Sequence, residues 1–227
     1  MNWAALRLTP WLDTRALFVS RVPRGGRLLD LGSSDGETLN HMAELRPDLQ
    51  LLSVDLEGVP ERYPRGCEFV RANLETDRLS WAEGSVDAVT CMHLVEHLHS
   101  LGNLFSEVAR VMKPGGTAYF ETPHPKTVNW PSARGQFTLN FHDDPTHVRP
   151  VPTSELVAQA RLAGLRVVRE GTSRNWLFAA SWPVLRFLPP SRQRFTAQVH
   201  WGGWSAYCLA AKSRTPDDQR TTPSPEG

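Results

Sequence analysis

The sequence is poor in cysteine. Its 227 residues contain only three, Cys67, Cys91 and Cys208, and they lie far apart along the chain. Such an odd, scattered set excludes a disulfide framework, and the sequence has no Cys-x-x-Cys pair that would indicate a metal site. We therefore expect free thiols in a reducing compartment, in a chain long enough to bury a core without covalent cross-links.

Long hydrophobic runs are also missing. No stretch reaches the roughly 18 consecutive apolar residues that are typical of a transmembrane helix. The first twelve residues lack the basic flank and the apolar run of a signal peptide. We therefore predict a cytoplasmic protein.

The chain has no excess of either charge, because its 25 basic and 24 acidic residues leave a net charge of +1. This balance argues against nucleic acid as a partner, although a chain with balanced charge can still carry a local basic patch. The length predicts one domain over residues 1–212, with insertions at 123–152 and 174–203. The polar, proline-bearing residues 213–227 are expected to form a disordered tail.

Short apolar runs alternate with segments of helical periodicity over residues 27–122. The first five expected strands lie at residues 27–31, 50–55, 67–71, 85–91 and 117–121. Apolar residues repeat at helical spacing at 37–46 and most clearly at 101–112, which the turn Lys113–Gly116 ends. This alternation predicts a parallel sheet covered by helices on both faces, in which ligands bind at the carboxyl ends of the strands.

The second half of the chain begins with residues 123–152, which are rich in proline and histidine and show no clear periodicity. A loop of this length in a compact domain is usually functional. Thr153 is then expected to cap a helix that ends at Leu162. Two further strands are predicted at 165–169 and 204–211.

The most informative segment is Leu28–Gly36, an apolar strand that runs into a glycine turn and then a helix. Gly32 and Gly36 permit close approach of a ligand to the backbone. Asp55 ends the next strand, where a carboxylate can accept hydrogen bonds from both hydroxyls of a ribose. The spacing does not match the Gly-x-Gly-x-x-Gly pattern of NAD enzymes, and the Gly-Lys-Ser/Thr of a P-loop is missing.

Five segments in order resemble motifs of the class I S-adenosylmethionine (SAM)-dependent methyltransferases of type 11/23. These segments are residues 28–36, Asp55 with its neighbours 53–56, residues 72–74, Asp87 followed by 93–97, and residues 105–116. The resemblance covers residues 27–122, and the two strands expected later in the chain agree with the order of strands in the family. It implies an α/β fold with a Rossmann-like, doubly wound, seven-stranded sheet that is mostly parallel with an antiparallel last strand.

The resemblance also implies SAM as cosubstrate, and it assigns contacts to particular residues. Asp30 would lie near the amino group of the methionine part, and Asp55 would hold the ribose. The remaining implied contacts are Gly32, Ser34 and Gly36 along the methionine and ribose edge, Leu56, Asn73 and Leu74 around the adenine, and His93 near the methyl group. Ser34 departs from the family, which often has glycine there. For Glu96 and His97 we favour a structural role, as capping or pairing groups near a helix start.

Residues 137–150 place two histidines, two aspartates and an arginine within eight positions. Transfer of a methyl group to a hydroxyl requires removal of the hydroxyl proton, so His147 or His142 is a candidate base, oriented by Asp143 or Asp144. Arg149 is a candidate for binding the acceptor. The same side chains could instead bind a divalent cation or satisfy the loop backbone, and the spacing matches no specific metal motif, so we predict no metal.

Residues 141–150 also resemble a loop in bacterial methyltransferases similar to methionine-biosynthesis W-type proteins, which are associated with surface polysaccharides and glycolipids. This resemblance implies a small-molecule or glycan acceptor with a reactive sugar hydroxyl. Residues 174–203 mix tryptophan, phenylalanine and arginine and are interrupted by Pro183, Pro189 and Pro190. We expect this insert to fold into short pieces that form a lid, a dimer contact or a peripheral membrane contact.

Two alternatives to a small-molecule O-methyltransferase remain open. One is a methyltransferase for nucleic acid or protein, which the near-neutral charge and the lack of an Asn-Pro-Pro-Tyr or Asp-Pro-Pro-Tyr motif disfavour. The other is a non-catalytic methyltransferase-like partner protein, which the intact glycine turn and acids disfavour.

Overall fold

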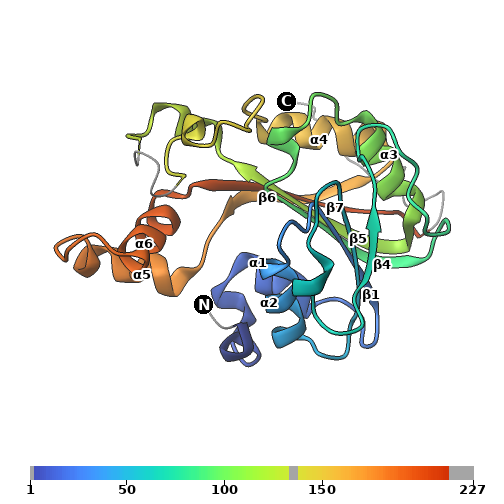
Figure 1. Cartoon of the computed structure of the whole chain (residues 1–227), viewed down its shortest axis with the longest axis horizontal. Coiled ribbons are helices and arrows are strands. Elements are labelled where there is room, and N and C mark those ends of the chain that lie inside the picture. Colours follow the sequence, from blue (N-terminus) through green and yellow to red (C-terminus); the bar gives the residue numbers. More distant parts are fainter. Residues whose placement is uncertain (1–2, 133–137, 215–227) are drawn as a thin grey trace, which may run out of the picture.

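A seven-stranded sheet forms the centre of the computed structural model, which describes residues 3–132 and 138–214 (Figure 1). Its strand order is β3-β2-β1-β4-β5-β7-β6. The strands are β1 Arg27–Leu31, β2 Gln50–Asp55, β3 Glu68–Arg71, β4 Val86–Met92, β5 Met112–Pro123, β6 Arg166–Ser173 and β7 Ser205–Ala211. Strands β1 to β5 pair in parallel, whereas β7 pairs antiparallel with β5 and β6. The predicted Rossmann-like sheet with an antiparallel last strand is confirmed.

Helices cover both faces of this sheet, with α1 and α2 on one side and α3 and α4 on the other (Figure 1). The helices are α1 Thr14–Ser20, α2 Glu37–Leu45, α3 Gly102–Val111, α4 Thr153–Leu162, α5 Trp176–Leu185 and α6 Arg192–Gly202. Consecutive strand residues point to opposite faces. Leu28 accordingly packs in the core cluster that contains α1 and α2, and Leu29 packs in the cluster that contains α3 and α4.

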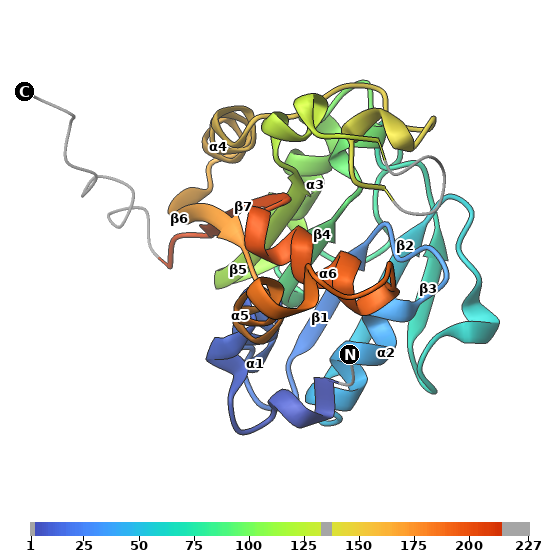
Figure 2. The ribbon, with the colours of Figure 1, turned by 90° about the vertical axis from the view of Figure 1, so that its left-hand side faces the viewer.

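The insert at residues 174–203 forms the pair α5 and α6, which Figure 2 shows in front of the sheet. The prediction that Pro183 interrupts this segment is wrong, because Pro183 lies inside α5. A proline in the last turn removes only one backbone hydrogen bond, and the helix ends two residues later at Leu185. Six large apolar side chains of the insert are about half or more exposed: Trp176, Leu177, Val184, Phe187, Leu188 and Trp201.

Two predicted boundaries also differ from the structure. Thr153 is the first residue of α4 and not its cap, because Pro152 occupies the extended position before the helix. Strand β5 begins at Met112 and not at Thr117, and its pairing with β4 shifts register next to Val86. The glycine turn therefore forms an irregular start of the strand, and α3 ends at Val111, one residue before the expected end.

The three cysteines are free thiols, as predicted. Among the helices of the described residues, none has the length and apolarity needed to cross a bilayer. Residues 215–227 of the predicted disordered tail and Phe137 of the histidine-rich loop lie outside the described residues.

Candidate active site

The loop between β1 and α2 has a backbone that favours glycine. Gly32 and Gly36 have φ angles of +75° and +82°, and Ser34 also has a positive φ, of 46°. A Cβ atom on Gly32 would lie 3.0 Å from the side chain of Leu94, and one on Gly36 would collide with the ring of Tyr63. Both glycines are therefore required by backbone conformation and by packing. The turn that the sequence predicted is present, and Ser34 at its tip is exposed.

Asp55 joins this loop to the end of β2. Its Oδ2 accepts a hydrogen bond from the backbone N–H of Ser34 at 2.8 Å, and its Oδ1 accepts one from Glu57 at 2.7 Å. Each oxygen of an ionised carboxylate has further capacity to accept hydrogen bonds. The next side chain, Leu56, is 57% exposed although it is apolar. A carboxylate beside an exposed apolar surface at the carboxyl edge of the sheet fits the ribose and adenine of SAM.

Asp30 lies within β1 and is only 3% exposed. The hydroxyl of Thr90 on β4 donates a hydrogen bond of 2.6 Å to its Oδ1. Burial outweighs this hydrogen bond and raises the pKa of Asp30 to about 7. An ammonium group placed beside Asp30 would favour the ionised carboxylate, which suits the methionine end of SAM.

Asn73 and Leu74 follow β3, on the side where the adenine is expected. The side-chain oxygen of Asn73 accepts a hydrogen bond from the backbone N–H of Glu75 at 2.9 Å. Leu74 is buried in the core cluster that contains α3. These two residues shape the turn after β3, and their contact with adenine stays a prediction.

His93 follows β4 and has a left-handed backbone, with a φ of 55°. Its Nδ1 lies 3.2 Å from Oε1 of Glu96, and its Nε2 lies 3.0 Å from Oε1 of Glu121. Burial opposes protonation of the ring, but the hydrogen bonds to Glu121 and Glu96 outweigh it and raise the pKa of His93 to about 9. The Nη2 of Arg15 also lies 3.1 Å from Nε2 of His93, and the His93 ring packs against Trp204 with centroids 5.2 Å apart.

Glu121 on β5 connects His93 to the N-terminal helix. Arg15 of α1 forms an ion pair with Glu121, which is fully buried, and the hydroxyl of Tyr119 donates to the same carboxylate at 2.6 Å. Burial opposes ionisation of Glu121, yet the Arg15 charge and the hydrogen bond from His93 hold its pKa well below the ordinary value. The carboxyl ends of β4 and β5 thus carry a network of ionisable side chains around the buried carboxylate of Glu121.

A cavity of about 630 Å³ opens beside this network, between the start of α2 and the α5–α6 insert. Its lining includes Trp3, Asp13, Arg15, Glu37, Thr38, His41, Asn175, Phe178, Ser191, Arg192, Gln193, Thr196 and His200. Glu37 and Thr38 directly follow Gly36, so the cavity adjoins the glycine loop. The insert therefore forms one wall of a pocket next to the expected methionine end of SAM.

His200 contributes a neutral imidazole to this cavity. Burial, together with the charge of Arg15, lowers the pKa of His200 to about 4. Its Nδ1 accepts a hydrogen bond of 3.1 Å from the backbone N–H of Asn175. The proton of the neutral ring is therefore on Nε2, which makes His200 a hydrogen-bond donor.

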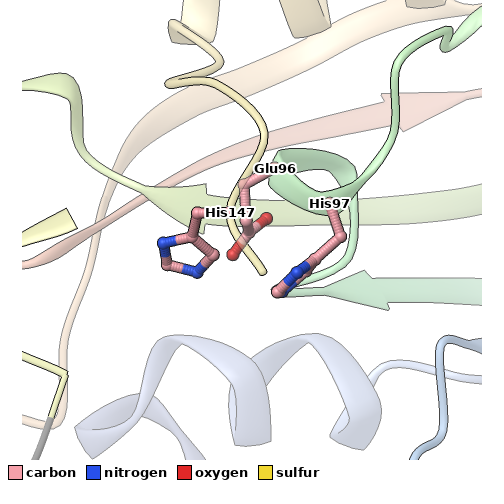
Figure 3. Close-up of side chains that lie close together, drawn as sticks. All are labelled: Glu96, His97 and His147. Carbon is pink, nitrogen blue, oxygen red and sulfur yellow. The ribbon is translucent and has the colours of Figure 1, made fainter. Parts of the chain in front are cut away.

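The predicted catalytic residues His142, Asp144 and His147 lie on the loop around η6 and not in the cavity lining. The side chain of His142 is exposed, while Asp143 completes a capping box with Asn140 around the short helix η6 Phe141–Asp143. The Oδ1 of Asp144 accepts a hydrogen bond from the Thr146 hydroxyl at 2.5 Å. The side chain of His147 is 4% exposed and points toward Glu96 and His97 (Figure 3).

The structure thus places only part of the predicted set together. His147 approaches the segment after β4, which holds His93. The Oδ2 of Asp144 lies 3.8 Å from Nε2 of His147. Asp143 instead forms the capping box of η6. None of these residues is among the described residues that line the cavity. A catalytic role for His147, Asp144 and His142 stays a prediction.

Sequence reasoning missed Arg15, Glu121 and His200. Glu121 did carry a signal, because it is an acid inside the apolar strand run Thr117–Thr122. Arg15 and His200 carried none, since they come near the site only through the packing of α1 and α6.

Comparisons with known proteins identify the family. A family model described as a methyltransferase domain matches residues 3–170. Curated proteins named ubiquinone biosynthesis O-methyltransferase are 28% identical to this chain. The one from Burkholderia thailandensis matches over 170 residues, which is 70% of each chain, and the one from Acinetobacter baylyi matches over 177 residues, which is 71% of this chain and 70% of that one.

Solved structures share the fold. An S-adenosylmethionine-dependent methyltransferase from Mesorhizobium loti superposes with a TM-score of 0.62 at 18% identity, covering 91% of this chain and 98% of the other. A putative methyltransferase in complex with the Haloferax volcanii Trm112 activator gives a TM-score of 0.65 at 17% identity, covering 93% and 97%. Together with the family match, these likenesses establish that the chain belongs to the methyltransferase-domain family and is a SAM-dependent methyltransferase.

Proposed function

We propose that the enzyme transfers the methyl group of SAM to a hydroxyl of a small, ring-containing acceptor that binds in the cavity beside α2. The cavity carries this proposal, because it adjoins the glycine loop and is walled by both the N-terminal segment and the insert. A volume of about 630 Å³ lies within the range of small-molecule sites, which is roughly 300–1,000 Å³.

Flat side chains in the lining favour a ring. Trp3 stacks on His41 with an interplanar angle of 9°, and Phe178 stacks on His200 with an angle of 19°. Planar or puckered rings pack well against such surfaces. Both pairs belong to the cavity wall, on opposite elements of the chain.

Hydrogen-bonding groups in the same lining favour hydroxyls. Arg15, Arg192 and the Nε2–H of His200 are donors, whereas Asp13 and Glu37 are acceptors. Arg15 pairs with Glu121, and Arg192 pairs with Glu37, within the protein. A hydroxylated ring would still add hydrogen bonds to these groups, which a purely apolar molecule would only desolvate.

The chain's own residues would act mainly by positioning. When bound, SAM supplies an electrophilic methyl group. Asp55 and the loop at Ser34 would hold its ribose, and Asp30 would hold its amino group. The insert would exclude water from the acceptor, and the donors of the cavity would orient its hydroxyl in line with the methyl group. The hydroxyl would lose its proton to a carboxylate of the cavity lining, such as Glu37, as its oxygen bonds to the methyl carbon and the bond from that carbon to sulfur breaks.

Two observations bear on the chemical class of the acceptor. The loop at residues 141–150 favours a sugar hydroxyl, by its resemblance to polysaccharide-associated enzymes. The relatives named ubiquinone biosynthesis O-methyltransferase favour O-methylation more generally. We propose a hydroxylated ring as the shared chemistry, with sugar and phenolic rings as the two arms of the test.

The test is methyl transfer from radiolabelled SAM to matched panels of free sugars, lipid-linked sugars and phenols. Labelled product from one of these panels is expected, together with a higher acceptor KM when Phe178 or His200 is changed. Labelling of only protein or nucleic-acid acceptors would overturn the proposal.

A further inference from the structure

Three side chains outside the cavity converge on one point. Glu96 and His97 belong to the short helix η4 Val95–His97, and His147 comes from the loop after η6. One ligand atom from each of the three lies within 4.8 Å of the others. Figure 3 shows the carboxylate of Glu96 between the two imidazole rings.

Glu96 supplies a buried oxygen atom that lacks a partner. Its residue is 0% exposed, and its Oε1 lies 3.2 Å from Nδ1 of His93. Its Oε2 is buried and has no hydrogen-bond partner. A buried carboxylate oxygen without a hydrogen-bond partner is unfavourable, so a cation bound at this position would remove the penalty.

His147 is held in the tautomer that a metal ligand requires. Its Nδ1 lies 2.6 Å from the carbonyl oxygen of Phe141, which can only accept, so Nδ1 carries the proton. The lone pair of the neutral ring is then on Nε2. A hydrogen bond from the other ring nitrogen to a backbone carbonyl is the usual support of a metal-binding histidine.

His97 is supported in the same way. Its Nδ1 lies 3.2 Å from the carbonyl oxygen of Thr146 and 3.0 Å from the Thr146 hydroxyl. That hydroxyl donates to Asp144 at 2.5 Å, so it accepts from His97. Nδ1 of His97 therefore carries the proton, and its Nε2 is free to bind a metal.

We propose that Glu96 Oε2, His97 Nε2 and His147 Nε2 bind one Zn²⁺ ion. Two imidazole nitrogens and one carboxylate oxygen suit zinc, whereas Mg²⁺ and Ca²⁺ prefer oxygen ligands only. Ligand atoms about 2.0 Å from a tetrahedral zinc lie roughly 3.3 Å apart, so the three side chains would move closer together when the ion binds. A water molecule would complete the coordination.

Asp144 would be a positioning residue for this site. It reaches His97 through the Thr146 hydroxyl, and its Oδ2 lies 3.8 Å from Nε2 of His147. The bound ion would join η4 to the histidine-rich loop, which the backbone hydrogen bond from Val148 to the carbonyl of Glu96 already brings together at 2.8 Å. The inference gives His147 the role of a ligand in place of a base, and it does not depend on which acceptor is methylated.

The test is zinc binding to the full chain, with any affinity tag removed and metal stripped with a chelator. Isothermal titration with Zn²⁺ alone should show one site, and Mg²⁺ at the same concentrations should give no heat of binding. His97→Gln and His147→Gln should each weaken zinc binding more than about 100-fold, and Asp144→Asn about 10–100-fold. His99→Ala is the control, because His99 is exposed and lies two residues from His97.

Circular dichroism of each variant checks folding, and His97→Gln is the safer variant because His97 is less buried than Glu96. Failure of the folded wild type to bind zinc would overturn the proposal. So would equal affinity in the wild type and the folded His97→Gln variant, or a loss caused by His99→Ala. Binding of SAM is measured separately, so failure here leaves the proposed function standing.

Discussion

Arg15 of α1 and Glu121 of β5 form a buried ion pair although 106 residues separate them in the chain. The pair joins the N-terminal helix to the carboxyl end of the central sheet and supplies a positive charge to a fully buried acid. The Nε2 of His93 and the hydroxyl of Tyr119 also contact the same carboxylate.

Arg15→Ala should destabilise the protein. Removing one partner of a fully buried pair costs about 3–5 kcal/mol, but Arg15 is 28% exposed and His93 remains, so we expect about 2 kcal/mol. The free energy of unfolding in urea measures the effect. Arg62→Ala is the matched control, because its ion pair with Asp35 is more than half exposed on both sides and should contribute less than about 0.5 kcal/mol. Equal effects of the two substitutions would contradict a structural role for the buried pair.

Asp55→Ala should abolish the stabilisation of the protein by SAM. For the wild type, SAM at about 100 times its dissociation constant should add about 2.7 kcal/mol, which is visible as a rise in melting temperature. Glu57→Ala is the control, since only the backbone N–H of Glu57 contacts Asp55. An unchanged shift in Asp55→Ala would remove Asp55 from the ribose site.

Asp30 should make stability depend on pH in the absence of SAM. Its pKa is raised to about 7 in the folded protein from 3.8 in the unfolded chain, so the folded state binds the proton more tightly. The contribution of Asp30 to the free energy of unfolding is therefore largest below about pH 4. It decreases as the pH rises toward 7, by roughly 4 kcal/mol in total.

Asp30→Asn keeps a side chain that can accept the Thr90 hydrogen bond but does not ionise. The difference in unfolding free energy between this variant and the wild type should grow from pH 4 to pH 7 and then level off. Urea titrations at closely spaced pH values measure this difference. A constant difference over that range would show that burial does not shift this carboxyl.

Phe178→Ala should weaken acceptor binding without affecting SAM. Phe178 lines the cavity and stacks on His200. Its loss should remove a ring contact with the acceptor that contributes about 0.5–1.5 kcal/mol in addition to the burial of apolar surface. The acceptor KM should therefore rise roughly tenfold. Leu177→Ala is the control on the same helix, because Leu177 is 53% exposed and lies outside the cavity lining. Steady-state kinetics and a SAM thermal shift separate the two effects, and an unchanged acceptor KM would place the acceptor elsewhere.

Local features could be predicted from the sequence, whereas contacts between distant segments could not. Gly32, Gly36 and Asp55 were identified because a strand, a turn and a strand end fix their positions within a few residues. The pairing of Arg15 with Glu121 depends on how α1 packs across the sheet, which no periodicity encodes. His147 was singled out for its neighbours Asp143 and Asp144, but the fold turns it toward Glu96 and His97, about fifty residues away.

His147→Cys should distinguish a zinc ligand from a base at this position. A thiolate binds zinc as well as imidazole does, so the variant should keep one zinc site, and Co²⁺ in its place should gain a thiolate-to-metal absorption band that the wild type lacks. His147→Gln is the comparison, because an amide neither binds zinc well nor acts as a base. If His147 is a base, turnover falls in both variants whether or not zinc is present. If His147 is a ligand, zinc restores the melting temperature of the cysteine variant but leaves that of the glutamine variant unchanged.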